Sequence, residues 1–319
     1  MKAMRMIGPR KSTVVDVPDL QPAAGQVLVK IKYNGVCMSE WHPWDEAKGG
    51  ERMGHEPMGT VAALGEGVTG FTVGERVTGL SMTPCYSEYC LCRQGNLVHI
   101  PDNLSDEDAL AEPLSCLISV ASKLRVEKSG DPVAIVGTGY MGLGLLTLLR
   151  LQGAGKVIAV DPRIEARENA LRFGADEVYK PDTVPQRYIV TSWDDTMHAR
   201  GIQLVGEFSG VESGLRLAGD MTGIHGTLGV GGWHQGGDRT VDFRLWGWKG
   251  ITVINTHERR EAYQAACCRN AMELLSSGRW CFKGVTNHIY GLNEFDRANE
   301  DLANKPNGYI KGLIRCSEW

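Results

Sequence analysis

The sequence has no apolar run long enough to cross a membrane and no segment with the apolar core of a signal peptide. A membrane helix needs about 20 uninterrupted apolar residues, and the start of the chain, MKAMRMIGPRKSTVVDV, is broken by charged residues. Basic runs with interleaved aromatic residues are also missing, and a formal net charge of -4 gives no reason to expect a polyanionic partner. We therefore expect a cytoplasmic protein that binds neither membrane nor nucleic acid.

Internal repeats, low-complexity segments and the cysteine spacing of secreted proteins are missing as well. Nine cysteines are present, but they are not arranged like a disulfide framework, so we expect most of them to be reduced thiols. A chain of 319 residues that is 42% hydrophobic can bury a large core. Its length fits two ordinary domains better than one.

Hydrophobic periodicity divides the chain into a β-rich part and an α/β part. VLVKIKY, residues 27–33, alternates as a half-buried strand does, and residues 59–64 read as a second strand before a GEGV turn. A helical pattern begins after residue 106. It is followed by the short apolar run DPVAIVG, which is typical of a buried parallel strand.

The segment from this strand to residue 180 follows strand–helix–strand–helix–strand order, which is half of a doubly wound parallel sheet. Apolar stretches at IQLVGEF, GTLGVGG and GITVIN can supply further strands. The tail after residue 257 is mixed. We therefore predict an α/β protein with a β-rich domain of residues 1–115 and 258–319 and an inserted nucleotide-binding domain of residues 116–257.

A glycine-rich turn directly follows the first strand of the inserted domain, in VAIVGTGYMG. Gly137, Gly139 and Gly142, with Tyr140 and Met141 between them, open the next helix. The glycines allow a tight turn, close approach of the backbone to a pyrophosphate, and packing of helix on sheet, while the helix N-terminus faces the anion. The pattern alone is weak, but its place between strand and helix predicts a dinucleotide site.

Asp161 ends the next strand, KVIAVD, at the position of a carboxylate that hydrogen-bonds a ribose diol and repels a 2′-phosphate. NAD is therefore favoured over NADP. A helix-capping role for Asp161 remains an alternative. Arg163 leaves NADP possible, since its guanidinium could meet a phosphate or lie against the adenine.

Metal-binding side chains gather in NGVCMSEWHPW and RMGHEPMGT. Thiolate, imidazole and carboxylate together suit zinc, although each residue alone has an ordinary structural explanation. The candidate metal or proton-transfer groups are Cys37, Glu40, His42, His55 and Glu56. A catalytic zinc takes three protein ligands and leaves one position for substrate, so a further ligand is expected from elsewhere. Glu112, in LAEPLSC, is the candidate, and Cys116 competes with it.

GHEPMGTVAALGEGV, with GVCMSE before it and GTGYMG after it, resembles the signature of the zinc-dependent medium-chain alcohol dehydrogenases. The similarity spans essentially the whole chain. It implies a GroES-like catalytic domain, a Rossmann domain and homo-oligomers, either dimers or tetramers. The EPLS stretch resembles the sorbitol, threonine and glucose dehydrogenase branches.

The resemblance assigns roles to the metal-site residues. Cys37, His55 and Glu112 would hold one catalytic zinc, with Glu56 beside the metal or ligating it in some states, and Glu40 would orient His55. The family's run of four closely spaced cysteines is missing, so no structural zinc is expected. Cys85, Cys90 and Cys92 are interpreted as packing residues.

The same resemblance implies the chemistry. Zinc would polarise the substrate oxygen so that an alkoxide can release hydride to the nicotinamide. Ser39 and His42 match positions that carry the proton to the surface; otherwise they are a capping serine and an exposed histidine.

Gly210, Gly231 and Thr256 lie in loops that resemble cofactor contacts, and Lys311 resembles a basic residue near the pyrophosphate. Glycines at strand ends and surface lysines are also common without a ligand.

The residues predicted around the cleft favour a polyol or sugar over a simple aliphatic alcohol. They are Ser39, Glu40, Trp41, Trp44 and Ser81. Three other readings stay open: a threonine-type amino-alcohol dehydrogenase, a zinc-free quinone or enone reductase, and a nucleotide-binding subunit without catalysis.

Overall fold

The computed structural model describes residues 1–198 and 200–317. The chain divides into two compact units, one of Met1–Cys116 with Arg259–Trp319 and one of Leu117–Glu258. These boundaries lie one residue from the predicted junctions. Each unit is described by itself below.

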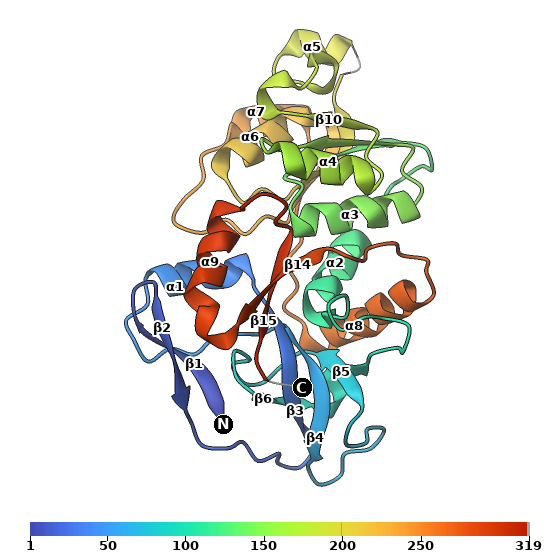
Figure 1. Ribbon diagram of the computed structural model, residues 1–319. Coiled ribbons are helices and arrows are strands. Elements are labelled where there is room, and N and C mark those ends of the chain that lie inside the picture. The colour runs from blue at the N-terminus through green and yellow to red at the C-terminus, as the bar shows by residue number, and fades with distance from the viewer. Residues whose placement is uncertain (199, 318–319) are drawn as a thin grey trace. The chain divides into compact units, whose positions relative to one another are not determined.

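The first unit is built on antiparallel strand pairs with one parallel pair, β14 and β15 (Figure 1). A two-stranded sheet pairs β1 (Lys2–Gly8) with β2 (Lys11–Asp16). The larger sheet has the order β14-β15-β3-β4-β5-β7, and β6 also pairs with β3. Its strands are β3 (Gln26–Gly35), β4 (Pro57–Leu64), β5 (Arg76–Gly79), β6 (Tyr89–Arg93), β7 (Leu97–His99), β14 (Thr286–Gly291) and β15 (Lys311–Arg315).

Strand β3 organises this sheet because its alternate residues are apolar and buried, as the sequence predicts. Val27, Val29 and Ile31 point into a core that they share with residues of β1, β6 and β15. Strand β15 pairs antiparallel with the end of β3, with Leu313 opposite Gly35. The C-terminal tail therefore completes the N-terminal sheet.

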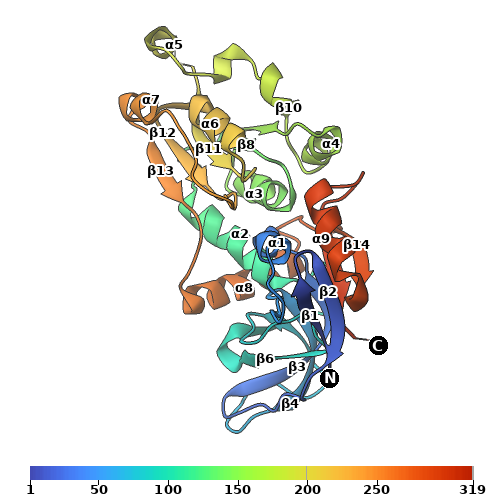
Figure 2. The same cartoon turned by 90° about the vertical axis from the view of Figure 1, so that its left-hand side faces the viewer.

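Helices of the first unit cover this sheet and border its loops. They are η1 (Met38–Glu40), α1 (Trp41–Asp45), η2 (Gln94–Asn96), α8 (Glu261–Ser276), η5 (Leu292–Glu294) and α9 (Phe295–Asn304). Helix α2 (Ala111–Lys123) contains the boundary between the units. Figures 1 and 2 show α1 and α9 side by side, although about 250 residues of sequence separate them.

The second unit is a six-stranded sheet in which every neighbouring pair of strands is parallel (Figure 2). The order β10-β9-β8-β11-β12-β13 is that of a doubly wound dinucleotide-binding sheet, so the predicted fold class is confirmed. The strands are β8 (Pro132–Val136), β9 (Lys156–Val160), β10 (Glu177–Tyr179), β11 (Ile202–Glu207), β12 (Thr222–Val230) and β13 (Thr252–Asn255). The helices are α3 (Tyr140–Leu151), α4 (Ile164–Arg172), η3 (Pro181–Thr183), η4 (Gln186–Tyr188), α5 (Trp193–Met197), α6 (Glu212–Met221) and α7 (Phe243–Lys249).

Across the two described stretches of the chain, no helix combines the length and the apolar character that spanning a membrane requires.

Candidate active site

Three of the predicted metal-site residues meet at the end of β3. Cys37 lies just beyond this strand with extended backbone, and His55 and Glu56 directly precede β4. The ligand atoms of Cys37, His55 and Glu56 all lie within 4.8 Å of one another. Because β3 and β4 pair with each other, with Asn34 opposite Pro57, the sheet itself brings these short segments together.

Glu40 holds the imidazole of His55 from behind. Glu40 Oε1 is 3.0 Å from His55 Nδ1 and also accepts the Gly54 N–H at 2.7 Å, while Tyr86 Oη donates to Glu40 Oε2 at 2.6 Å. Glu40 is only 7% exposed. Desolvation is the largest single influence and lowers the pKa of His55, but hydrogen bonds and charge interactions with Cys37 and Glu40 together outweigh it, so the net pKa is raised. The carboxylate on Nδ1 leaves Nε2 as the nitrogen that can bind a metal.

Glu56 has a buried cationic partner, Lys311, which the sequence had placed near the pyrophosphate. Lys311 Nζ, on β15, is 2.5 Å from Glu56 Oε2 and donates to the Val36 carbonyl at 3.0 Å. A Cβ at Gly35 would lie 1.8 Å from Glu56 Oε2, so the carboxylate occupies the space that a side chain there would need. Lys311 is 5% exposed, not a surface lysine, and it compensates the charge of Glu56.

Glu112 is not among the three residues whose ligand atoms meet. It lies in the first turn of α2, where Gln264 Nε2 donates to its Oε1 at 3.0 Å. Cys116 Sγ is 3.7 Å from the same oxygen. Burial is the largest cause of a raised pKa at both Glu112 and Cys116.

The donor set of Cys37, His55 and Glu56 fits zinc, because zinc takes thiolate, imidazole and carboxylate ligands in four-coordinate sites. These residues leave a coordination position for substrate or for Glu112. Cys90 and Cys92 are fully buried on β6, with their sulfur atoms 3.8 Å apart, and Cys85 is fully buried too. Within the described residues these three thiols do not form a cluster with the compactness of the Cys37 group.

The two residues predicted to carry the proton point to different partners. Ser39 Oγ donates to Cys37 Sγ at 3.3 Å, so this serine touches a predicted metal ligand. His42, on α1, lies 3.2 Å from Glu46 through its Nε2 and is 38% exposed at its side chain. His42 therefore has access to solvent.

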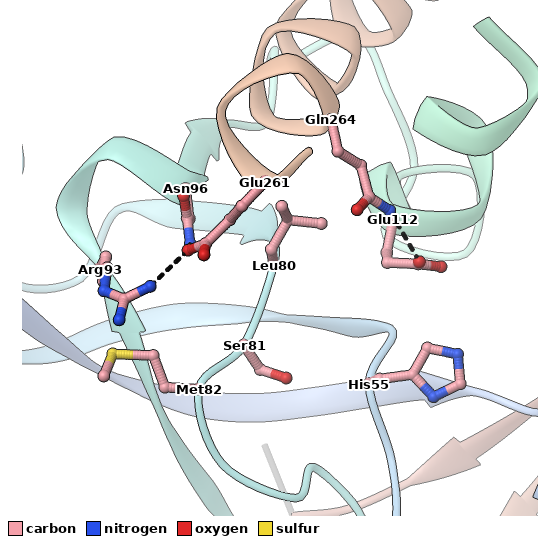
Figure 3. A pocket seen from close by; sticks show the side chains of 9 residues that line it. All are labelled: His55, Leu80, Ser81, Met82, Arg93, Asn96, Glu112, Glu261 and Gln264. Atoms are coloured by element: carbon pink, nitrogen blue, oxygen red, sulfur yellow. Dashed lines mark hydrogen bonds and ion pairs between the residues drawn. The ribbon is translucent and has the colours of Figure 1, made fainter. Parts of the chain in front are cut away.

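A pocket of about 430 Å³ opens beside the metal-site residues (Figure 3). Figure 3 shows His55, Glu112 and Gln264 at one end and Arg93, Asn96 and Glu261 at the other. The nine lining residues are His55, Leu80, Ser81, Met82, Arg93, Asn96, Glu112, Glu261 and Gln264.

The predicted cleft residues are distributed differently. Ser81 does line this pocket. Trp44 does not, because it is 1% exposed and its indole N–H donates to Asp296 at 2.8 Å inside the core. Glu40 is buried behind His55. Arg93, Asn96, Glu261 and Gln264 were missed, since no local pattern marks residues that only folding brings to one pocket.

In the second unit, each glycine of the GTGYMG turn has a separate role. Gly137 has a φ of +90°, and a Cβ there would lie 2.4 Å from the Ser209 nitrogen. A Cβ at Gly142 would lie 2.0 Å from the Gly137 oxygen. Beside Gly139, by contrast, the space is open within 4 Å. Packing therefore requires Gly137 and Gly142, whereas Gly139 leaves the turn accessible at the start of α3.

The other predicted cofactor-site residues are largely buried. Tyr140 is buried in the first turn of α3, and Met141 beside it is half-buried. Asp161 follows β9 and is 3% exposed. Its carboxylate accepts the Thr138 N–H at 2.9 Å and contacts Arg163 Nε and Nη2, each at 3.0 Å. Asp161 therefore fixes the turn, and Arg163 turns toward this carboxylate.

Glu207, at the end of β11, joins the two loops that contain Gly210 and Gly231. Its Oε1 accepts the N–H groups of Ser209 and Gly210 at 2.7 and 3.1 Å, and its backbone carbonyl accepts the Gly231 N–H at 2.9 Å. A Cβ at Gly231 would lie 2.9 Å from Thr256 Oγ1, so Gly231 and Thr256 are adjacent. The sequence analysis did not single out Glu207.

Known proteins match both parts of the chain. The family described as alcohol dehydrogenase GroES-like domain matches residues 23–104, and the family described as zinc-binding dehydrogenase matches residues 141–277. The 2-dehydro-3-deoxy-L-galactonate 5-dehydrogenase of Pseudoalteromonas atlantica is 27% identical over 99% of both chains. The sorbitol dehydrogenase of Halalkalibacterium halodurans is 26% identical over 89% of this chain and 90% of its own. The solved alcohol dehydrogenase TADH from Thermus sp. ATN1 has a TM-score of 0.81 and 25% identity, covering 99% of each chain.

The chain belongs to the zinc-type medium-chain alcohol dehydrogenases. It is an oxidoreductase that acts on CH–OH groups of a small-molecule substrate, and the family implies zinc and NAD(P) as cofactors.

Proposed function

We propose that this dehydrogenase uses a single zinc ion to transfer hydride between a secondary alcohol, favoured as a polyol or sugar, and NAD. The observation that carries the proposal is the meeting of the Cys37, His55 and Glu56 ligand atoms within 4.8 Å, with Glu40 on the far nitrogen of His55. That arrangement supplies three zinc donors together with the carboxylate that orients the imidazole.

Two carboxylates compete for the third ligand position. Glu56 lies with Cys37 and His55 but is paired with Lys311, whereas Glu112 is held by Gln264. We propose that Glu56 can bind zinc when it separates from Lys311, and that Glu112 can bind zinc when it separates from Gln264. Bound zinc supplies Lewis-acid stabilisation of charge on the substrate oxygen. A second, structural zinc is not part of the proposal, because Cys85, Cys90 and Cys92 are packed within the apolar core.

We propose NAD rather than NADP because Asp161 stands after β9, where its carboxylate can accept the hydroxyls of a ribose diol. Ribose binding would require Arg163 to release at least one of the oxygens that it contacts. Gly137, Gly139, Tyr140, Met141 and Gly142 would hold the pyrophosphate at the start of α3. Gly210, Gly231 and Thr256 would border the cofactor further along.

The proton that the alcohol loses must be transferred to solvent. Ser39 Oγ is a hydroxyl beside the Cys37 thiolate, and His42 is a solvent-accessible imidazole one helical turn further on. We propose that Ser39 takes up the proton first and that His42 passes it to water.

The polar lining of the pocket supports a polyhydroxylated substrate. Ser81, Asn96 and Gln264 can exchange hydrogen bonds with hydroxyl groups, and the relative named for sorbitol matches 89% of this chain. An amino-alcohol substrate of the threonine type is the second candidate, because Glu261 could receive an ammonium group.

We also propose a homodimer or homotetramer. Strand β13 is the edge of its sheet, and Val253 on it is 42% exposed, so this edge can pair with a second copy. Nine free cysteines favour a reducing compartment such as the cytoplasm.

The test is zinc content and NADH formation, measured with polyols, sugars, aliphatic alcohols and threonine. About one zinc per chain and turnover of a polyol, both lost in His55→Ala, are expected from a site with three protein ligands. The matched control is His99→Ala, an exposed histidine on β7 whose loss should change neither quantity. Zinc-free, folded wild-type protein with full turnover would overturn the proposal and favour a zinc-free reductase.

A further inference from the structure

The end of the pocket opposite His55 is formed by a cluster of three polar side chains (Figure 3). Glu261, the first residue of α8, accepts from Arg93 Nη1 at 2.6 Å and from the Asn96 amide. Arg93 ends β6 and Asn96 ends η2, so the cluster joins two segments 165 residues apart. We call these three residues the distal cluster.

The distal cluster offers both kinds of hydrogen-bonding group. Glu261 contributes only acceptors, whereas Arg93 and the amide nitrogen of Asn96 contribute donors. Hydrogen bonds from Asn96 and then Arg93 lower the pKa of Glu261, so it is ionised at neutral pH. A carboxylate beside two donors suits the hydroxyl groups of a sugar chain, because each hydroxyl both donates and accepts.

The charge of the pocket disfavours an anionic substrate. Among its lining residues Arg93 is the one permanent cation, and Glu261 already neutralises it. A carboxylate or phosphate on the substrate would have to displace Glu261 from Arg93 and would meet the like charge of Glu261.

The pocket also has room for more than a short diol. Its volume of about 430 Å³ lies within the usual range for small-molecule sites, roughly 300–1,000 Å³. A substrate whose carbinol lies beside His55 needs several further carbons before it reaches Glu261, since the two residues line opposite ends of the pocket.

We propose that Arg93, Asn96 and Glu261 recognise hydroxyl groups remote from the reacting carbon, so that the enzyme selects uncharged, extended polyols over short diols and over aldonates or sugar phosphates of equal length. This inference rests on the proposed polyol dehydrogenase function and adds the residues that set its selectivity.

The test compares wild type with Glu261→Gln on hexitols (sorbitol, mannitol and galactitol), on 2,3-butanediol, and on the aldonate corresponding to the best hexitol. The substitution should lower kcat/KM for the hexitol about tenfold, mainly through KM, because a charged acceptor is lost. Turnover of 2,3-butanediol should change less than twofold. The ratio of aldonate to hexitol kcat/KM should rise, since Arg93 is left unpaired and can bind a carboxylate.

Glu273→Gln is the matched control, because Glu273 lies on the same helix in a surface pair with Arg279, outside the pocket lining. Glu273→Gln should leave kcat/KM unchanged for the hexitol, for 2,3-butanediol and for the aldonate. An equal effect of Glu261→Gln on hexitol and butanediol, or no effect on either, would overturn the inference while leaving the polyol activity intact.

Calorimetric binding of the same hexitol separates this inference from the proposed function. If wild type binds the hexitol without oxidising it and Glu261→Gln weakens that binding about tenfold, the distal cluster stands and the dehydrogenase proposal fails. If Glu261→Gln leaves hexitol binding unchanged, the distal cluster does not recognise the substrate, whatever the rate of turnover.

Discussion

Glu40 shows how one buried side chain can set the properties of a metal site. It receives the His55 imidazole, the Gly54 N–H and the Tyr86 hydroxyl, so three groups fix its position. Its contact with His55 was predictable through the family resemblance. The contribution of Tyr86 was not, because that residue lies 46 positions away in the sequence.

The first prediction concerns Glu40→Gln. The variant keeps the size of the side chain but removes the charge that orients and polarises His55, so zinc should bind about 10–100-fold more weakly. Zinc competition with a chelator measures this affinity. Glu46→Gln is the control, since Glu46 is an exposed acid beside His42, and it should leave zinc affinity unchanged. Equal zinc affinities for wild type and Glu40→Gln would contradict the role assigned to Glu40.

Two other residues show what sequence patterns miss at this scale. Trp44 was placed at the pocket through the family resemblance, yet its indole N–H donates to Asp296, which lies 252 positions later. Lys311 resembled a basic residue near the pyrophosphate, with a surface lysine as the alternative, yet it is the buried partner of Glu56. Both errors arise from contacts between the two ends of the chain.

At the scale of elements, the strand–turn–helix unit from β8 to α3 was predictable because its signals are local. The buried strand, the glycines and the helix lie within 20 residues. The glycines of this turn are present for different structural reasons, however. Gly142 is required by the backbone of Gly137, whereas nothing lies within 4 Å of a Cβ at Gly139.

The second prediction uses this difference. Gly142→Ala should destabilise the protein by about 1–3 kcal/mol, because its Cβ would overlap the Gly137 carbonyl. Gly139→Ala should change stability by less than about 0.5 kcal/mol, yet weaken NAD binding at least about tenfold, since its Cβ would enter the space of the pyrophosphate. Denaturant unfolding and cofactor titration measure the two effects. Unaltered NAD affinity in Gly139→Ala would remove the turn from the cofactor site.

The third prediction concerns acid stability at the edge strand β10. Glu177 accepts from Lys156 Nζ at 2.9 Å and from the hydroxyls of Tyr179 and Tyr188, each at 2.8 Å. The Lys156 hydrogen bond leads the causes that lower the Glu177 pKa from 4.5 to about 2, although desolvation opposes it. A depressed folded pKa stabilises the protein above pH 4.5, and this contribution is lost as the pH falls toward 2.

Glu177→Gln should therefore lower the free energy of unfolding at pH 7 by about 1–3 kcal/mol and flatten its fall between pH 4.5 and 2. Glu168→Gln, an exposed position on α4, provides the matched control. Unfolding curves at several pH values measure both variants. Parallel curves for wild type and Glu177→Gln would show that Glu177 does not carry this acid dependence.

At the scale of the whole molecule, the inserted α/β unit was easier to predict than the unit around it. The strands β8, β9, β11, β12 and β13 were visible as short apolar runs, and parallel neighbours follow from local strand–helix order. The tail after residue 258 was left undivided. Its last strand, β15, finds its partner in β3, almost 280 residues earlier, and that pairing leaves no local signal.

The same distance effect limits what the sequence says about selectivity. The predicted metal ligands Cys37, His55 and Glu56 lie close together in sequence and carry a recognisable signature. The pocket residues Arg93 and Glu261 are 168 positions apart and meet only in the folded chain. Reaction class could therefore be predicted from the sequence, whereas the residues proposed to select the substrate required the structure.

X-ray absorption at the zinc edge of the purified, active enzyme tests the central claim most directly. The account predicts about one zinc per chain with a single sulfur ligand at about 2.3 Å and nitrogen or oxygen in the remaining positions, as Cys37, His55 and a glutamate would give. Fully active protein without zinc would contradict it. So would a shell of three or four sulfur atoms, which would move the metal to the buried thiols of Cys85, Cys90 and Cys92.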